Sequence, residues 1–156
     1  MADEFNRERI IGRLSDHAAE LEGLTQGLSP ALLRERTVEG RWSLHEYVVR
    51  LSILQDFYIE RIARILVEKE PSLGEPPHES GDGYLVCDFQ SHFVSFREQR
   101  KTLVTLLRSL EAKQWDREGS HPNLRHYTVE LCMESLMRRE EEILYQMFMV
   151  LFGMKE

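Results

Sequence analysis

The chain has 156 residues and a formal net charge of −7 at pH 7, with 42% hydrophobic and 30% charged residues. This length suits one domain, so we expect residues 1–156 to form a single core. The hydrophobic and charged residues are interleaved, which is typical of a folded chain rather than a disordered one. The acidic balance argues against a nucleic-acid partner, because binding a phosphate backbone requires a concentrated basic face.

No apolar run approaches the roughly 20 residues of a membrane span, and the first five residues are acidic where a signal peptide would be basic and then apolar. We therefore expect a cytoplasmic protein without a membrane partner. The two cysteines, Cys87 and Cys132, make neither a disulfide framework nor a metal-binding motif, and we interpret them as small buried hydrophobic residues.

The first predicted helix covers residues 5–26, where apolar residues recur at alternating steps of four and three, as in a helix packed in a bundle. Its seam consists of Ile10, Leu14, His17, Leu21, Leu24 and Leu28. Gly27 ends this helix. Ser29 and Pro30 then predict an N-cap and a first helical residue for a short turn over residues 31–35.

The second predicted helix covers residues 43–68. Ser43 is a good N-cap, and Glu46 three residues later completes a capping box. One face of this helix carries, at spacings of three and four, the residues Tyr47, Arg50, Leu54, Phe57 and Arg61. Arg50 is therefore expected on the face that packs in the core.

Prolines and glycines between residues 71 and 83 predict a long surface loop, in which we expect His78 to be solvated. A third helix is predicted over residues 85–110, with Phe89, Phe96, Leu103 and Leu110 at intervals of seven. Residues 111–125 are read as irregular, and Thr128 is predicted to cap a fourth helix that ends near residue 153. With no convincing strand, the pattern predicts an all-α four-helix bundle with long crossover loops.

Three segments, in this order and spacing, resemble the DinB/YfiT-like superfamily over nearly the whole chain. The first is Gly-Arg-Trp-Ser-Leu-His-Glu-Tyr-Val-Val-Arg-Leu at 40–51. The second is Leu-Arg-Ser-Leu at 107–110 with Trp-Asp-Arg at 115–117, and the third is Ser-His-Pro at 120–122 with Tyr-Thr-Val-Glu-Leu at 127–131. Together they are more specific than any one of them.

The resemblance implies a four-helix bundle, commonly a homodimer, with a divalent metal held by three histidines. One histidine lies on the second helix and two lie one turn apart on the fourth. Relatives include thiol-dependent transferases and metal-dependent hydrolases. Such a metal keeps an open position, where it lowers the pKa of a bound thiol or water and makes a nucleophile at neutral pH.

The three positions that correspond to these histidines hold Arg50, Arg139 and Ile143 in this chain. None of them is a metal ligand, because arginine keeps its proton and isoleucine has no donor atom. No histidine occurs between residues 127 and 156. We therefore expect a divergent member that lacks the metal triad and has no cofactor.

Arg50 and Arg139 are the candidate binding residues, with Tyr47, Glu142, Ile143 and Gln146 nearby. Two buried guanidinium groups must be neutralised or hydrated, because an unpaired buried charge is strongly unfavourable. One interpretation is an ion-pair network with Glu46, Asp56, Glu140 or Glu142 as partners. The other is that both arginines hold a small anionic or thiol ligand in the vestigial pocket.

His17 and His92 both fall on helix seams. With a glutamate they could form a relocated metal site, although a histidine on an apolar face is more often a core residue with one satisfied nitrogen. We expect His45 to be exposed and His121 to fix the loop before Pro122.

The second half of the fourth helix is apolar on more than one side. Its residues include Met133, Met137, Met147, Phe148, Met149 and Phe152. This width predicts either a homodimer surface or cover by a short neighbouring segment. Three functions remain open: a metal-free protein that binds a small molecule, a protein used for its interaction surface, or a metal-dependent hydrolase or thiol-dependent transferase with relocated ligands.

Overall fold

The structure is a computed structural model, and it describes residues 2–76, 81 and 83–155. Four long helices form the bundle predicted from the sequence: α1 (Ala2–Thr25), α3 (Leu44–Val67), α4 (Phe89–Ser109) and α6 (Val129–Lys155). No helix in the described part of the chain is both long and apolar enough to cross a membrane. The expectation for His78 concerns a residue outside the described ranges.

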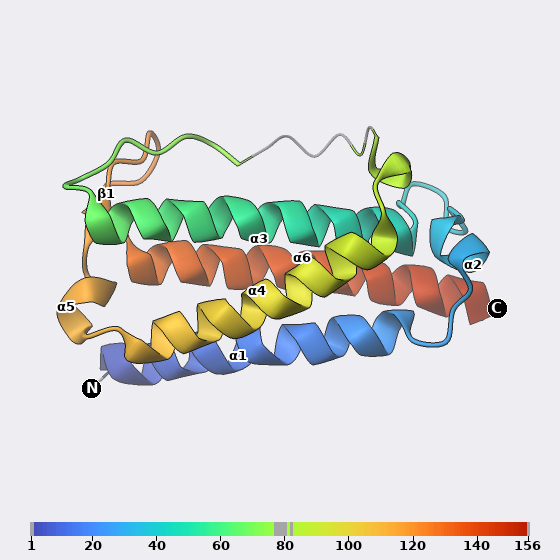
Figure 1. Ribbon diagram of the computed structural model, residues 1–156, viewed down its shortest axis with the longest axis horizontal. Helices are drawn as coiled ribbons and strands as arrows, with labels where there is room; N and C mark the ends of the chain where they lie inside the picture. Colours follow the sequence, from blue (N-terminus) through green and yellow to red (C-terminus); the bar gives the residue numbers. More distant parts are fainter. Residues whose placement is uncertain (1, 77–80, 82, 156) are drawn as a thin grey trace.

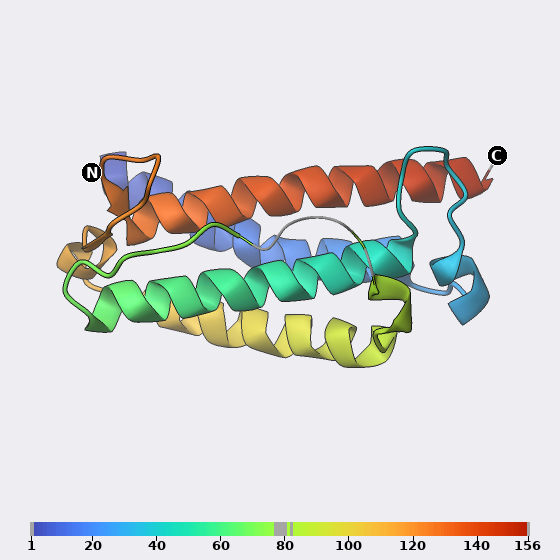
Figure 2. The ribbon, with the colours of Figure 1, turned by 90° about the horizontal axis from the view of Figure 1, so that it is seen from above.

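The helices do not alternate in direction along the chain. α3 and α4 run the same way, and α1 and α6 run the opposite way (Figure 1). α3 packs against α4 and α6, and α1 packs against the same two helices. Figure 2 shows the pairing from above, with α1 beside α6 and α3 beside α4. Parallel neighbours such as α3 and α4 require a connection that returns along the bundle, which explains the long crossover after α3.

Two short helices lie between these long ones. α2 (Pro30–Arg34) begins as predicted, because the Ser29 hydroxyl accepts the backbone N–H of Leu32 at 3.2 Å. α5 (Ala112–Trp115) lies in the segment 111–125, for which the sequence predicts irregular structure. The third long helix begins later than predicted, because Asp88 caps it and a 3₁₀ turn, η1 (Tyr84–Val86), comes before it.

The structure adds two short strands where the sequence has no convincing one. β1 (Glu118–Gly119) and β2 (Tyr127–Thr128) form an antiparallel ladder in which Glu118 faces Thr128. Strands of two residues are too short to produce an alternating pattern in the sequence. The crossover after α3 also contacts the segment that follows β1, because the Leu73 N–H donates to the carbonyl of Ser120 at 2.9 Å.

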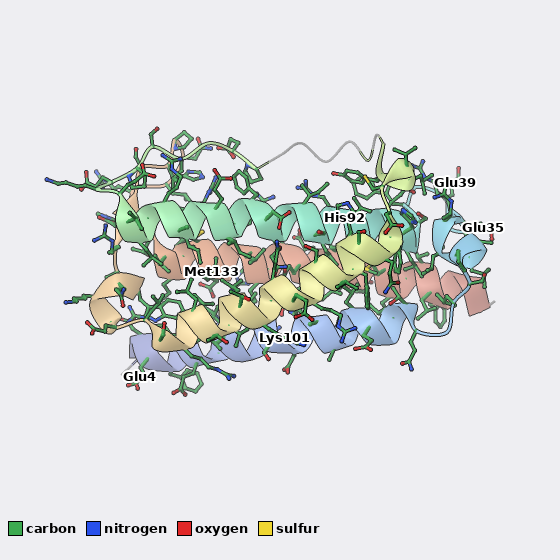
Figure 3. The ribbon with its side chains drawn as sticks, in the orientation of Figure 1. Glu4, Glu35, Glu39, His92, Lys101 and Met133 are labelled. Carbon is green, nitrogen blue, oxygen red and sulfur yellow. The ribbon has the colours of Figure 1, made fainter. Side chains whose placement is uncertain are left out.

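The predicted seams form the core. Ile10, Leu14 and Leu21 of α1 are fully buried, as is Phe96 of α4, whereas Phe89 and Leu110 at the ends of the α4 seam are only half-buried. Met133 lies between the ribbons of α6 and α4, while the exposed side chains of Glu4 and Lys101 point away from the bundle (Figure 3).

Candidate functional site

The start of α3 is fixed by Glu46, whose side chain is buried. Its carboxylate accepts the backbone N–H of Ser43 at 3.0 Å, and the Ser43 hydroxyl accepts the backbone N–H of Glu46 at 3.2 Å, so the predicted capping box is present. Arg36 donates two further hydrogen bonds to the same carboxylate, at 2.9 and 2.5 Å. Burial raises the pKa of Glu46, but the hydrogen bonds from Arg36 and Ser43 outweigh it and leave this pKa below its ordinary value.

A pocket of about 620 Å³ lies between this end of α3 and α6. Arg50 lines it from α3 and Arg139 lines it from α6, so the two arginines singled out in the sequence share one cavity. Arg50 is fully buried, Arg139 is half-buried and Glu142 is exposed. Among the described residues, the lining consists of Gly40, Trp42, Tyr47, Arg50, Arg139, Glu142, Ile143, Tyr145 and Gln146.

Arg139 lines the pocket without a protein partner among the described residues: it makes no hydrogen bond or salt bridge with any of them. Its neighbour Arg138 lies outside the pocket and has a carboxylate partner. The Arg138 side chain is 68% exposed and lies 3.5 Å from the carboxylate of Glu134, outside the pocket. Adjacent arginines on α6 therefore have different environments.

The end of the pocket near the start of α3 is aromatic. The rings of Trp42 and Tyr47 have centroids 5.3 Å apart, and the ring of Tyr84 meets Trp42 edge-on at 5.5 Å. Gly81 packs against the same indole. A Cβ atom at position 81 would lie 2.9 Å from a ring carbon of Trp42. Because its neighbours hold it on several sides, the Trp42 ring is a fixed wall of the pocket.

A hydrogen bond joins the two sides of the pocket at this aromatic end. Arg41 Nε donates to the side-chain oxygen of Gln146 on α6 at 2.7 Å. The loop that carries Trp42 is therefore fastened to α6 as well as to α3.

Two of the ion-pair partners predicted for Arg50 and Arg139 are engaged elsewhere. Glu46 binds Arg36, and Glu140 binds Arg100 on α4, so these parts of the prediction are wrong. The exposed Asp56 lies outside the pocket, while Glu142 lies on its rim. Helical spacing identified the inward arginines, but it could not show that Glu140 would pair with an arginine on another helix.

The centre of the bundle holds a buried polar cluster to which each long helix contributes one side chain: His17, Gln55, Arg100 and Glu140. Arg100 donates to Glu140 at 2.8 Å and to Gln55 at 2.6 Å, and His17 Nδ1 lies 2.9 Å from the Glu140 carboxylate. Burial raises the pKa of Glu140, but the charge of Arg100 and the hydrogen bonds from His17 and Arg100 outweigh it, leaving this pKa below its ordinary value of 4.5.

The sequence reasoning missed Arg100, although a signal was present. Arg100 follows Phe96 by four residues and precedes Leu103 by three, which places it on the apolar stripe of α4. The same rule singled out Arg50 on α3.

The histidines lie in separate environments. His17 contacts Glu140 and Glu141, whereas His92 contacts the hydroxyl of Ser52 at 3.1 Å. His45 was expected to be exposed, but it is buried and donates to the carbonyl of Cys87 at 2.9 Å, because the segment before α4 folds over the start of α3. His121 accepts the backbone N–H of Asn123, which fits its predicted role in the loop.

The residues present do not fit the metal that the family resemblance implies. Arg50, Arg139 and Ile143 offer no lone pair that a divalent cation would take at neutral pH. Within the described ranges, no three His, Cys, Asp or Glu side chains gather closely enough to hold a metal ion elsewhere.

The buried thiol of Cys132 is not activated. Burial raises its pKa to about 12, against the smaller opposing effects of Tyr127 and Arg61. Arg61 has a structural role, because it donates a hydrogen bond to the Tyr127 hydroxyl at 2.7 Å and lies over the ring of Phe57 at 4.5 Å. Cys87 is half-buried, so the expectation of two buried cysteines holds only for Cys132.

A larger hollow of about 850 Å³ lies at the opposite end of the bundle, between α1, the end of α4 and α5. Its central cation, Arg7, already binds Glu130 at 2.5 Å and Asp116 at 2.8 Å. The remaining charges along it are of both signs and mostly exposed. The smaller pocket with Arg139 is therefore the better candidate for a ligand site.

The chain belongs to the DinB superfamily, whose sequence model matches residues 13–138, more than half of the chain. Among solved structures it is similar to YfiT from Bacillus subtilis, described as a probable metal-dependent hydrolase with an unusual four-helix bundle topology. The TM-score is 0.80 at 18% sequence identity, covering 92% of this chain and 85% of that chain. This likeness shows the fold. No curated protein sequence matches the chain significantly.

Proposed function

We propose that this protein binds a small anionic molecule, without a metal ion, in the pocket between α3 and α6. The observation that carries the proposal is Arg139, a half-buried cation that faces the pocket with no hydrogen-bond or salt-bridge partner among the described residues. The planar donors of a guanidinium group suit a carboxylate, a phosphate or a thiolate in a partly desolvated site.

The lining favours binding over covalent catalysis. Its described residues include no serine, cysteine, histidine or lysine, and its one carboxylate, Glu142, is exposed on the rim. The two free cysteines of the chain suit a reducing compartment, which supports a cytoplasmic location.

We predict that small anions stabilise the protein through Arg139. At a concentration 100 times Kd, an anion that binds only the folded state adds about 2.7 kcal/mol to the free energy of unfolding. Thermal melts with acetate, benzoate, phosphate and a low-molecular-weight thiol should therefore show an upward shift for at least one of them. The shift should disappear in Arg139→Gln and persist in the matched control Arg138→Gln.

Two results would contradict this proposal. One is the absence of a shift with every anion in the panel, together with retention of a protein partner in pull-down, which would favour the interaction surface. The other is one equivalent of zinc, nickel or iron, found by elemental analysis of protein purified without chelator, which would restore the metal-dependent alternative.

We also propose that the protein forms a homodimer through α6. Tyr145, Phe148 and Phe152 form one stripe at spacings of three and four, and they are 57%, 51% and 51% exposed. No neighbouring segment within the described ranges buries this stripe. The alternative, in which a short segment of the same chain covers it, therefore finds no support among the described residues. Two α6 stripes related by a twofold axis would be self-complementary.

We expect Phe148→Glu to be monomeric in sedimentation velocity measurements while the original protein sediments as a dimer, because a buried carboxylate opposite its own copy is unfavourable. Val94→Glu, which alters an exposed apolar residue of α4, is the matched control and should remain dimeric. A monomeric original protein at micromolar concentration would contradict the proposal.

A further inference from the structure

We infer that the anion is a small aromatic carboxylate, bound with its carboxylate toward Arg139 and with its ring against Trp42. The inference rests on the proposed function and adds the chemical class of the ligand. The carrying observation is that the pocket has a cationic end at Arg139 on α6 and an aromatic end at Trp42, on the loop before α3.

The order of residues along α3 and α6 sets these two ends. The helices run in opposite directions (Figure 1), and the hydrogen bond from Arg41 to Gln146 marks where the start of α3 meets α6. Arg139 lies seven residues before Gln146, or about 10 Å along the helix axis. On α3, Arg50 lies one turn beyond Tyr47, in the same direction. The positive charges are therefore displaced from the aromatic wall along the bundle.

The aromatic end provides a ring-binding surface that is already in place. Trp42 is held by Tyr47, Tyr84 and the backbone at Gly81, so placing a ligand ring beside it costs little side-chain entropy. Aromatic pairs with centroids about 4.5–7 Å apart gain energy beyond the area that they bury. A ligand with a ring would use this wall, and one without a ring would not.

The cationic end favours a carboxylate over a highly charged phosphate ester. Arg139 brings one guanidinium group without a protein partner among the described residues, and the carboxylate of Glu142 lies on the same rim. A single planar carboxylate matches the fork of one guanidinium group. A dianionic phosphate would exceed the charge of this group and would also lie near the negative charge of Glu142, which is unfavourable.

The cavity is also larger than a compact anion needs. Its volume of about 620 Å³ lies within the range of roughly 300–1,000 Å³ that is usual for small-molecule sites. Acetate or phosphate would fill only the cationic end, whereas a carboxylate with one or two rings spans both ends.

Isothermal titration calorimetry with benzoate, indole-3-acetate, acetate and phosphate tests the inference. We expect the two aromatic carboxylates to bind at least ten times more tightly than acetate or phosphate. Trp42→Leu should reduce this advantage to less than about threefold while leaving the affinity for acetate unchanged. Arg139→Gln should weaken all four anions, and Arg138→Gln should change none of them.

The outcomes separate the inference from the proposed function. If acetate or phosphate binds as tightly as benzoate, and Arg139→Gln abolishes this binding, the anion site stands and the aromatic class is wrong. If none of the four binds, both are wrong. Should Trp42→Leu fail to fold, nuclear Overhauser effects in the unaltered protein decide: contacts between benzoate ring protons and the Trp42 indole support the inference, and their absence in the bound complex overturns it.

Discussion

Glu140→Gln is expected to lower the free energy of unfolding by about 3–5 kcal/mol, measured by urea denaturation at neutral pH. Glu140 is fully buried, and its carboxylate is the counter-charge of Arg100, which is 2% exposed. The substitution keeps the shape of the side chain but leaves the guanidinium without an opposing charge in the core. The lost energy is therefore mainly electrostatic.

Glu142→Gln is the matched control for this substitution. It removes a carboxylate two residues farther along α6, at an exposed position, and should change the stability by no more than about 0.5 kcal/mol. The double variant Arg100→Met/Glu140→Gln should recover part of the loss, because an apolar pair is not penalised for a buried charge. Equal effects of Glu140→Gln and Glu142→Gln would show that the buried pair is not stabilising the fold.

The buried carboxylate of Glu140 should also make the stability of the fold depend on pH. Because the pKa of Glu140 is lower in the folded state than its ordinary value of 4.5, the unfolded chain binds the proton more tightly. Its stabilising contribution is therefore complete above about pH 5 and is lost as the pH falls through the folded pKa. Between about pH 6 and pH 3, Glu140→Gln should lose less stability than the original protein.

Glu46→Ala is expected to cost about 2–3 kcal/mol in the free energy of unfolding. The substitution removes the acceptor for the buried backbone N–H of Ser43 and for both hydrogen bonds from Arg36. An unsatisfied buried donor is more costly than a lost surface ion pair. Arg36→Ala, which changes a side chain that is 55% exposed, should therefore cost less than about 1 kcal/mol.

Glu60→Ala is the control for helix propensity, because Glu60 is exposed on α3 and gains a better helix former. It should leave the unfolding midpoint in urea unchanged or slightly raised. If Glu46→Ala behaves like Glu60→Ala, the capping box contributes nothing measurable.

Local signals in the sequence predicted the helix boundaries best. α3 runs from Leu44 to Val67 with caps at Ser43 and Glu68, within a residue of the predicted limits, because a capping box depends only on residues that are close in sequence. The start of α4 was placed too early. The apolar residues Leu85 and Val86 continue the pattern, but Asp88 provides the cap.

The candidate site could be predicted only in part. Helical periodicity and the order of the helices in the resembling family predict that Arg50 and Arg139 share one pocket. The aromatic wall was not predicted, because Trp42 meets Tyr84 across more than 40 positions of the chain. The burial of His45 was missed for the same reason, since its partner Cys87 lies beyond the crossover.

The cluster of His17, Gln55, Arg100 and Glu140 fixes the axial alignment of all four long helices at one level. Sliding any helix by one turn, about 5.4 Å, would remove a hydrogen-bonding group from a dry interior, while an all-leucine seam would tolerate the same slip at much lower cost. Arg139 directly precedes Glu140 in the chain, and Arg50 lies five residues before Gln55. The alignment therefore also determines how the two sides of the pocket face each other, so a substitution in the cluster can misplace a binding group that it never touches.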